Sequence, residues 1–307
     1  MDQVAIIGHQ PICRFLENAL KKHQVSHAYL FLGQELVGKG TVAKWFAERV
    51  SGDLVAGKNL IWLEVPAGIK ISDIRKLRSD LSLTNPFGGY RVAVLRQVEK
   101  MTTDAQNAFL KILEEPRTSV IFILTAKTPK GLLPTVISRV QSVRFAPVPR
   151  ETIAVALQRD GVDPDVAQRS ASLALGCPGK AKELSRAENL EVAEKQPREI
   201  IRLFSMLPHR RFQSAYRILE AEEIDFFRES AETVWRDLWL CRQGESRGTV
   251  NVGLRSEIAS LAQRLTPAQI SQGLRTIQKW PYLRAHHVNK KLLLEHFMIK
   301  AFPSTII

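Results

Sequence analysis

A glycine-rich segment near the N-terminus has the residue types and spacing of a phosphate-binding loop. Gly33 and Gly38 flank residues 34–37, and Lys39 follows directly. Glycines let backbone N–H groups turn toward an anion at the positive end of a helix, and the lysine adds a full charge. We therefore expect a loop descended from a nucleotide-binding one. The alternative is a strand-to-helix turn in which glycine serves the backbone geometry alone.

The residues that would hold a metal ion and activate water are missing. The position after the lysine normally carries Ser or Thr, whose hydroxyl binds Mg²⁺, but here it is Gly40, and Thr41 comes one residue late. At the end of a later apolar run, where P-loop ATPases carry acidic residues, this chain has Arg96 and Gln97. Arginine cannot bind Mg²⁺ and glutamine cannot accept a proton at neutral pH. We therefore expect no independent ATP hydrolysis.

Some nucleotide binding could nevertheless persist at this loop. The candidate site residues are Gly33, Gly38, Lys39 and Thr41. Because the loop retains its glycines and its lysine, residual ATP or ADP binding without hydrolysis is the most that we expect. No cofactor is predicted to be required.

Five short apolar runs must position this loop. They occupy residues 28–32, 60–65, 92–95, 120–124 and 142–145. Short runs of this kind, rich in β-branched residues, are typical of strands buried on both faces of a parallel sheet. Helix-period segments separate them, one after Gly38 and another from Thr102 to a stop at Pro116. The alternation predicts an α/β core with a parallel five-stranded sheet between helices.

The strand pattern ends at residues 147–149, and no strand is expected beyond that point. We predict three segments: an α/β core over residues 1–148, a small helical unit over residues 149–195 and a larger helical unit over residues 196–307. The length is about twice that of a typical domain, which fits more than one compact unit.

The composition limits the class of protein. Lys and Arg number 44 against 31 Asp and Glu, a formal charge of +13, and such an excess favours a polyanion partner or simply keeps the chain soluble. No apolar run is long enough to cross a membrane and no secretory signal is visible, so we expect a cytoplasmic protein without membrane contact. Three widely spaced cysteines, Cys13, Cys177 and Cys241, suit neither a disulfide framework nor a zinc site.

Taken in order, these residues resemble the AAA+ clamp-loader subunits of bacterial DNA polymerase III over nearly the whole chain. The most specific stretch, residues 100–116, resembles the helix after the second ATPase motif. Residues 132–140 resemble the Ser-Arg-Cys motif, with Val140 in place of the cysteine. Residues 176–181 are similar to the sensor-2 turn, and residues 289–295 to the terminal helix of the collar domain.

The resemblance implies an AAA+ P-loop core followed by an all-α lid, residues 149–195, and an all-α oligomerisation collar, residues 196–307. The ATP-hydrolysing tau and gamma members normally keep the loop hydroxyl and the acidic pair that this chain lacks, which favours the delta prime branch. Many relatives also insert a four-cysteine zinc module after the first helix. This chain has no cysteine there, so no zinc is expected, and residues 52–70 are the least defined part of the core.

The resemblance also implies roles for individual residues. Arg139, preceded by its motif partner Ser138, would be an arginine finger that acts in trans on ATP bound to a neighbouring subunit. The alternative is that Arg139 caps the preceding helix or pairs with a surface acid. Lys180, at the sensor-2 position, would reach a phosphate in its own subunit, or be a solvated helix lysine.

The function implied is that of a delta prime-like subunit of the DNA polymerase III holoenzyme, which loads the sliding clamp onto primed DNA. Its partners would be the tau/gamma and delta subunits and the clamp, with DNA contacted through the assembled complex. Basic core residues, among them Arg75 and Arg78, are candidates for DNA or clamp contact, or form a solvated face. Two alternatives stay open: a tau/gamma-like clamp-loader ATPase, and a stand-alone DNA-binding protein.

Overall fold

The computed structural model describes residues 6–51, 59–82, 90–115, 120–220 and 224–302. The predicted helix stop at Pro116 and residues 52–58 of the uncertain 52–70 segment lie outside these residues. The chain forms two compact units, one of residues 1–156 with 176–180 and one of residues 157–175 with 181–307. Each unit is described separately below.

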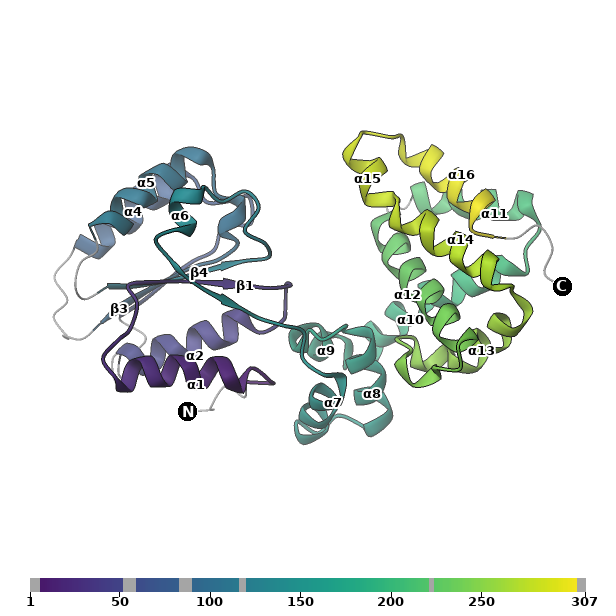
Figure 1. The fold of residues 1–307 in the computed structure, drawn as a ribbon, viewed down its shortest axis with the longest axis horizontal. Helices are drawn as coiled ribbons and strands as arrows, with labels where there is room; N and C mark the ends of the chain where they lie inside the picture. Colours follow the sequence, from purple (N-terminus) through teal and green to yellow (C-terminus); the bar gives the residue numbers. More distant parts are fainter. Residues whose placement is uncertain (1–5, 52–58, 83–89, 116–119, 221–223, 303–307) are drawn as a thin grey trace. The chain divides into compact units, whose positions relative to one another are not determined.

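The first unit is built on a parallel sheet of five strands in the order β2-β3-β4-β1-β5 (Figure 1). The strands are β1 (Ala28–Leu32), β2 (Leu60–Leu63), β3 (Arg91–Leu95), β4 (Val120–Ala126) and β5 (Gln141–Arg144). All five coincide with the apolar runs of the sequence, so the predicted sheet is confirmed. Every residue of β4 is buried, because helices cover both faces of the sheet and leave no solvated side.

Two groups of helices cover the two faces of this sheet (Figure 1). One face carries α1 (Gln10–Lys21) and α2 (Lys39–Ser51); the other carries α4 (Ile71–Ser82), α5 (Thr103–Glu114) and α6 (Pro134–Ile137), with the 3₁₀ turn η1 (Val98–Lys100) after β3. Phe46 is buried in the core between the sheet and the helices α1 and α2, and Phe109 is buried in the core on the opposite face. Helix α5 begins where Thr102 Oγ1 accepts a hydrogen bond from the Ala105 amide at 3.2 Å, which caps its first turn.

The described residues after β5 contain helices and no strand, as the sequence predicted. They form α7 (Arg150–Arg159), α8 (Pro164–Leu173), α9 (Pro178–Leu184), α10 (Ala187–Phe204), α11 (Pro208–Glu220), α12 (Ile224–Arg242), η2 (Ser246–Gly248), η3 (Val252–Leu254), α13 (Arg255–Arg264), α14 (Pro267–Gln278), α15 (Trp280–Ala285) and α16 (Lys290–Lys300). Trp235, Phe297 and Phe227 are buried together at the centre of the larger helical core. None of the described helices has the length and apolar character needed to cross a membrane.

Both helical segments predicted from the sequence contribute to the second unit, where η3 of the large segment contacts an ion pair of the small one. The Arg169 guanidinium of α8 donates to both carboxylate oxygens of Glu194 on α10, and this raises the pKa of Arg169. A Cβ atom at Gly253 of η3 would lie 2.9 Å from Glu194 Oε1, so the turn packs closely on this ion pair. The predicted boundary at residues 195–196, like the one at 148–149, stays a prediction.

Two helical glycines allow a direct test of this packing. A Cβ at Gly273 of α14 would lie 1.6 Å from Trp235 Nε1, whereas one at Gly40 of α2 would meet nothing within 4 Å. We expect Gly273→Ala to lower the free energy of unfolding of the second unit by about 2–3 kcal/mol through overpacking. The matched Gly40→Ala should raise that of the first unit by roughly 0.5–1 kcal/mol through helix propensity. Urea denaturation followed by circular dichroism measures both free energies of unfolding. If Gly273→Ala is as stable as the unsubstituted chain, the close contact at Gly273 is contradicted.

Candidate functional site

The glycine-rich loop lies at the carboxyl edge of the sheet. It follows β1, and the Gly33 amide donates to the Ala126 carbonyl at the end of β4 at 3.1 Å. On the other side of β1, the Phe145 amide donates to the Leu32 carbonyl at 2.7 Å. The loop therefore starts where three neighbouring strands end, which is the edge at which open α/β sheets bind ligands.

Both predicted glycines are required by the loop geometry. Gly38 has a φ of 118°, which L side chains rarely adopt. A Cβ at Gly33 would lie 2.7 Å from the Phe145 carbonyl oxygen, so no side chain fits there. His9 supports the loop from α1 through a 2.8 Å hydrogen bond between its Nε2 and the Val37 carbonyl, and burial lowers its pKa. The glycines thus satisfy a backbone requirement that exists whether or not a nucleotide binds.

The Lys39 ammonium occupies the interior of its own loop. Its Nζ donates to the carbonyl oxygens of Gly33 at 2.5 Å and Gln34 at 2.6 Å, and the side chain is almost fully buried. Burial lowers the pKa of Lys39, although the carboxylates of Glu99 and Glu35 act in the opposite direction. Two of the three N–H donors of the ammonium are therefore used within the loop.

Arg96, at the position of the missing metal-binding acid, forms an ion pair across the carboxyl edge. Its Nη1 lies 2.7 Å from Glu64 Oε2, just beyond β2, and its guanidinium lies 6.0 Å from the centre of the Trp62 ring. A cation already paired with a carboxylate has no capacity to bind Mg²⁺. Within the described part of the chain, no three His, Cys, Asp or Glu side chains are grouped so that they could hold a metal ion.

Glu99 is the nearest acidic residue that could replace the missing base, but it is held elsewhere. Its Oε1 accepts a hydrogen bond from the Lys127 amide at 2.9 Å, just beyond β4. Gln97, two residues earlier, is in the left-handed region with a φ of 53°, so the chain turns sharply before Glu99. Thr41 lies half-buried in the first turn of α2, and its hydroxyl makes no hydrogen bond to another described residue.

The sensor-2 turn lies directly against the loop. The Gly179 amide donates to the Leu36 carbonyl at 2.9 Å, and the Cys177 thiol donates to Gln34 Oε1 at 3.2 Å. Burial raises the pKa of Cys177, and the positive charges of Lys180 and Lys39 partly oppose this shift. The structure therefore brings Lys180, in the first turn of α9, to the same site as the loop lysine.

Arg139 and Ser138 lie directly after α6, and both bond back to it. Ser138 Oγ donates to the Thr135 carbonyl at 3.0 Å, and Arg139 Nη1 donates to the same carbonyl at 3.1 Å. Arg139 Nη2 also lies 2.9 Å from Glu114 Oε1 at the end of α5, and the arginine side chain is 38% exposed. Arg139 thus caps the preceding helix and pairs with a surface acid, which was the alternative to the finger. Exposed pairs of this kind contribute about 0–1 kcal/mol and exchange readily.

Arg139 and the loop lie at opposite edges of the sheet. Strands β1 and β5 run parallel, with Tyr29 beside Gln141 at one end and Leu32 beside Arg144 at the other. Gly33 follows the carboxyl end of β1, whereas Arg139 precedes the amino end of β5. A four-residue strand spans roughly 13 Å, so Arg139 cannot reach a nucleotide held by its own loop.

Gln106 is a site residue that the sequence reasoning missed. It is buried on α5, where its Nε2 donates to the Gly131 carbonyl at 2.7 Å and its Oε1 accepts from the Leu133 amide at 2.7 Å. These bonds fix the segment that leads into α6 and Arg139. The sequence carried one signal for it, because an amide side chain on the apolar face of a helix usually has a structural hydrogen-bonding role.

Comparisons with known proteins find similarity to subunits of DNA polymerase III. The family model described as "DNA polymerase III, delta subunit" matches residues 8–59 and 55–149. DNA polymerase III subunit delta' of Bacillus subtilis is 26% identical over 94% of both chains. Subunit tau of the same organism is 30% identical over 48% of this chain and 30% of its own length.

The structural comparison shows the same fold. A DNA polymerase III gamma subunit-related protein from Thermotoga maritima aligns over 92% of this chain and 97% of its own, with a TM-score of 0.52 and 18% identity. The AAA+ architecture expected from the resemblance is therefore confirmed. The chain is thus similar to the delta' and tau subunits of DNA polymerase III.

Proposed function

We propose that this chain is a delta prime-like subunit that does not hydrolyse ATP itself and supplies Arg139 to ATP bound by a neighbouring subunit. The observation that carries the proposal is the position of Arg139, exposed at the sheet edge opposite the chain's own loop. An arginine so placed is useful to a nucleotide only when another chain brings that nucleotide to it.

The loop geometry supports the loss of hydrolysis. Lys39 is bonded to the loop's own carbonyls, and Arg96 is paired with Glu64 where a metal-binding acid would stand. With Gly40 in place of a hydroxyl residue, the site has no obvious ligand for Mg²⁺. The subunit would therefore need no cofactor, and any ATP or ADP that it binds would be bound without turnover.

The trans role would require Arg139 to exchange partners. In the isolated chain its guanidinium pairs with Glu114, and in the assembly it would turn to the γ-phosphoryl group on the neighbour. The planar fork of arginine matches two phosphate oxygens, and a fixed positive charge stabilises the charge that grows in the transition state. Loss of a weak, exposed carboxylate pair opposes this exchange only slightly.

The proposed partners follow from the relatives. Subunits of the tau/gamma and delta types would complete the ring, and the helical residues 196–307 would form the collar, with residues 149–195 as the lid. The assembled complex, rather than this chain alone, would open the sliding clamp and place it on primed DNA. The chain's formal charge of +13 would then contribute to a DNA-contacting surface shared among subunits.

The isolated chain provides the first test. We expect phosphate release from ATP and Mg²⁺ to stay at the level of the buffer blank, because the metal-binding and base positions are absent. Calorimetry with ATP, repeated on Lys39→Ala, measures any residual binding through the loop. Phosphate release that Lys39→Ala abolishes would contradict the proposal and favour a tau/gamma-like ATPase.

The trans finger is tested in a reconstituted complex in which only the neighbouring subunit retains its ATP-binding lysine. We expect Arg139→Ala to lower phosphate release at that site by roughly 10³-fold, the lower end of the range for arginine fingers. Arg144→Ala, an exposed arginine of β5, is the matched control and should leave release unchanged. Glu114→Gln removes the ion-pair partner of Arg139, and phosphate release in this variant should equal or exceed that of the unsubstituted complex.

Two outcomes would count against the finger. If Arg139→Ala and Arg144→Ala behave alike in an intact complex, Arg139 serves only to cap α6. If Glu114→Gln reduces turnover as much as Arg139→Ala does, the ion pair itself, and not the free guanidinium, is what the assembly needs.

Gln106 should position the Arg139 segment. Gln106→Leu removes the partners of the Gly131 carbonyl and the Leu133 amide, and losing such a hydrogen bond costs about 1–1.5 kcal/mol. We expect hydrogen exchange of residues 131–139 to accelerate roughly tenfold, with a smaller effect in Gln106→Glu, which keeps the acceptor for Leu133. Unchanged exchange in this segment would show that α6 is held by its own contacts.

A further inference from the structure

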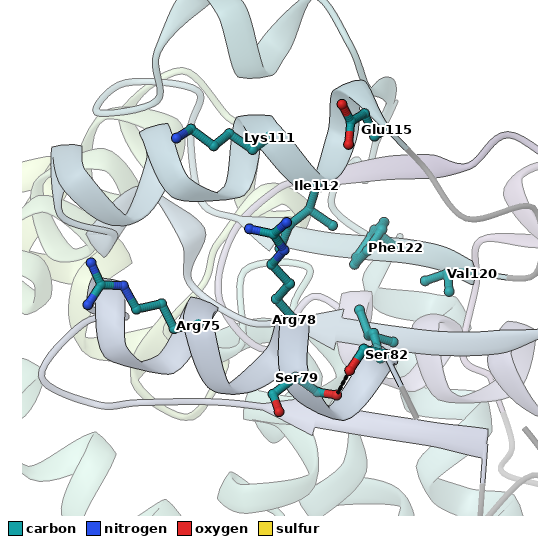
Figure 2. Close-up of a pocket in the computed structure, with 10 residues that line it drawn as sticks. Arg75, Arg78, Ser79, Ser82, Lys111, Ile112, Glu115, Val120 and Phe122 are labelled. Atoms are coloured by element: carbon teal, nitrogen blue, oxygen red, sulfur yellow. Dashed lines mark hydrogen bonds between the residues drawn. The ribbon is translucent and has the colours of Figure 1, made fainter. Parts of the chain in front are cut away.

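A pocket of about 480 Å³ lies between α4 and α5 at the amino end of β4 (Figure 2). Its apolar side is formed by Val120 and Phe122 of β4 and by Ile112 of α5. Sites that take small ligands or large side chains commonly have about 300–1,000 Å³. The pocket is distinct from the glycine-rich loop, which lies at the opposite, carboxyl edge of the same sheet.

Three cations line this pocket: Arg75 and Arg78 from α4, and Lys111 from α5. Figure 2 shows their charged ends all to one side of Phe122 and Val120, so the positive and apolar parts of the pocket are segregated. Within the described residues, none of the three makes an ion pair or a hydrogen bond, unlike Arg96 in the same unit. Glu115 is the one carboxylate among the described lining residues, so the pocket has an excess of positive charge, which favours the binding of an anionic group.

The C-terminal ends of helices α4 and α5 restrict which kind of anionic ligand the pocket can bind. Helix α4 ends at Ser82 and α5 at Glu114, so C-terminal carbonyl groups border the pocket and carry the negative end of each helix dipole. The Ser82 hydroxyl is already used, because it donates to the Ser79 carbonyl at 2.6 Å (Figure 2). A phosphate would find flexible cations but no backbone N–H groups at a helix N-terminus, which phosphate sites commonly use.

A peptide matches these surroundings better. Its carboxylates can pair with the mobile ends of Arg75, Arg78 and Lys111, its N–H groups can donate to the helix-terminal carbonyls or to Glu115, and one large apolar side chain can cover Phe122. We propose that this pocket binds an acidic segment of a partner protein that carries one large apolar side chain. The proposal does not depend on the role of Arg139.

The test uses the full chain and a short fluorescein-labelled peptide of aspartates followed by one phenylalanine, with fluorescence anisotropy as the readout. We expect Arg78→Glu to weaken binding roughly tenfold and Lys111→Ala to weaken it several-fold, with affinity falling as salt rises. Replacing the phenylalanine of the peptide by alanine should weaken binding roughly thirtyfold or more, as for an interface anchor. This change tests the apolar side of the pocket without disturbing the buried Phe122.

Arg14→Glu is the matched control. Arg14 is an exposed arginine of α1, which covers the other face of the sheet, and its reversal changes the net charge by the same amount as Arg78→Glu. If both variants lose the same affinity for the peptide, the effect is one of net charge alone and the proposal is overturned. A second result would also overturn the proposal: a labelled oligothymidylate binds the chain and loses affinity in Arg78→Glu, while the phenylalanine and alanine peptides bind equally well. The surface would then be a nucleic-acid contact.

Discussion

Parallel strand direction is the constraint on which the rest of the first unit depends. Because all five strands point the same way, everything that follows a strand gathers at one edge of the sheet, and everything that precedes a strand gathers at the other. The loop, Arg96 and Glu99 are brought together in this way at the carboxyl edge. Arg139 and the basic pocket lie at the amino edge, because helices antiparallel to the strands end there.

At the carboxyl edge, two cationic side chains are held by partners within the chain itself. Lys39 donates hydrogen bonds to the loop carbonyls and Arg96 forms an ion pair with Glu64, so both cations already have partners in the isolated chain. Burial of Lys39 lowers its pKa, and the carboxylates of Glu99 and Glu35 offset that shift only in part.

Much of the fold could be predicted from local patterns. The five apolar runs coincide with the five strands, and α2 and α5 begin at Lys39 and Thr103 as the glycine and threonine signals indicated. Gln106 could not be assigned a role, because its partners are the Gly131 carbonyl and the Leu133 amide, some twenty-five residues away. The partner of Arg139 was left open for the same reason, since Glu114 is a neighbour only after α5 and α6 pack.

The sequence by itself determined the elements of the core, the phosphate-loop geometry and the absence of acidic residues at the end of β3, because these depend on residue type and short-range spacing. Only the tertiary structure decided that Lys39 turns into its own loop, that Arg96 pairs with Glu64, and that Arg139 lies at the edge away from the loop. Which residues form ion pairs, and at which edge of the sheet each residue lies, depends on which strands become neighbours. Strand order is set by the packing of helices on both faces of the sheet, which no local pattern encodes.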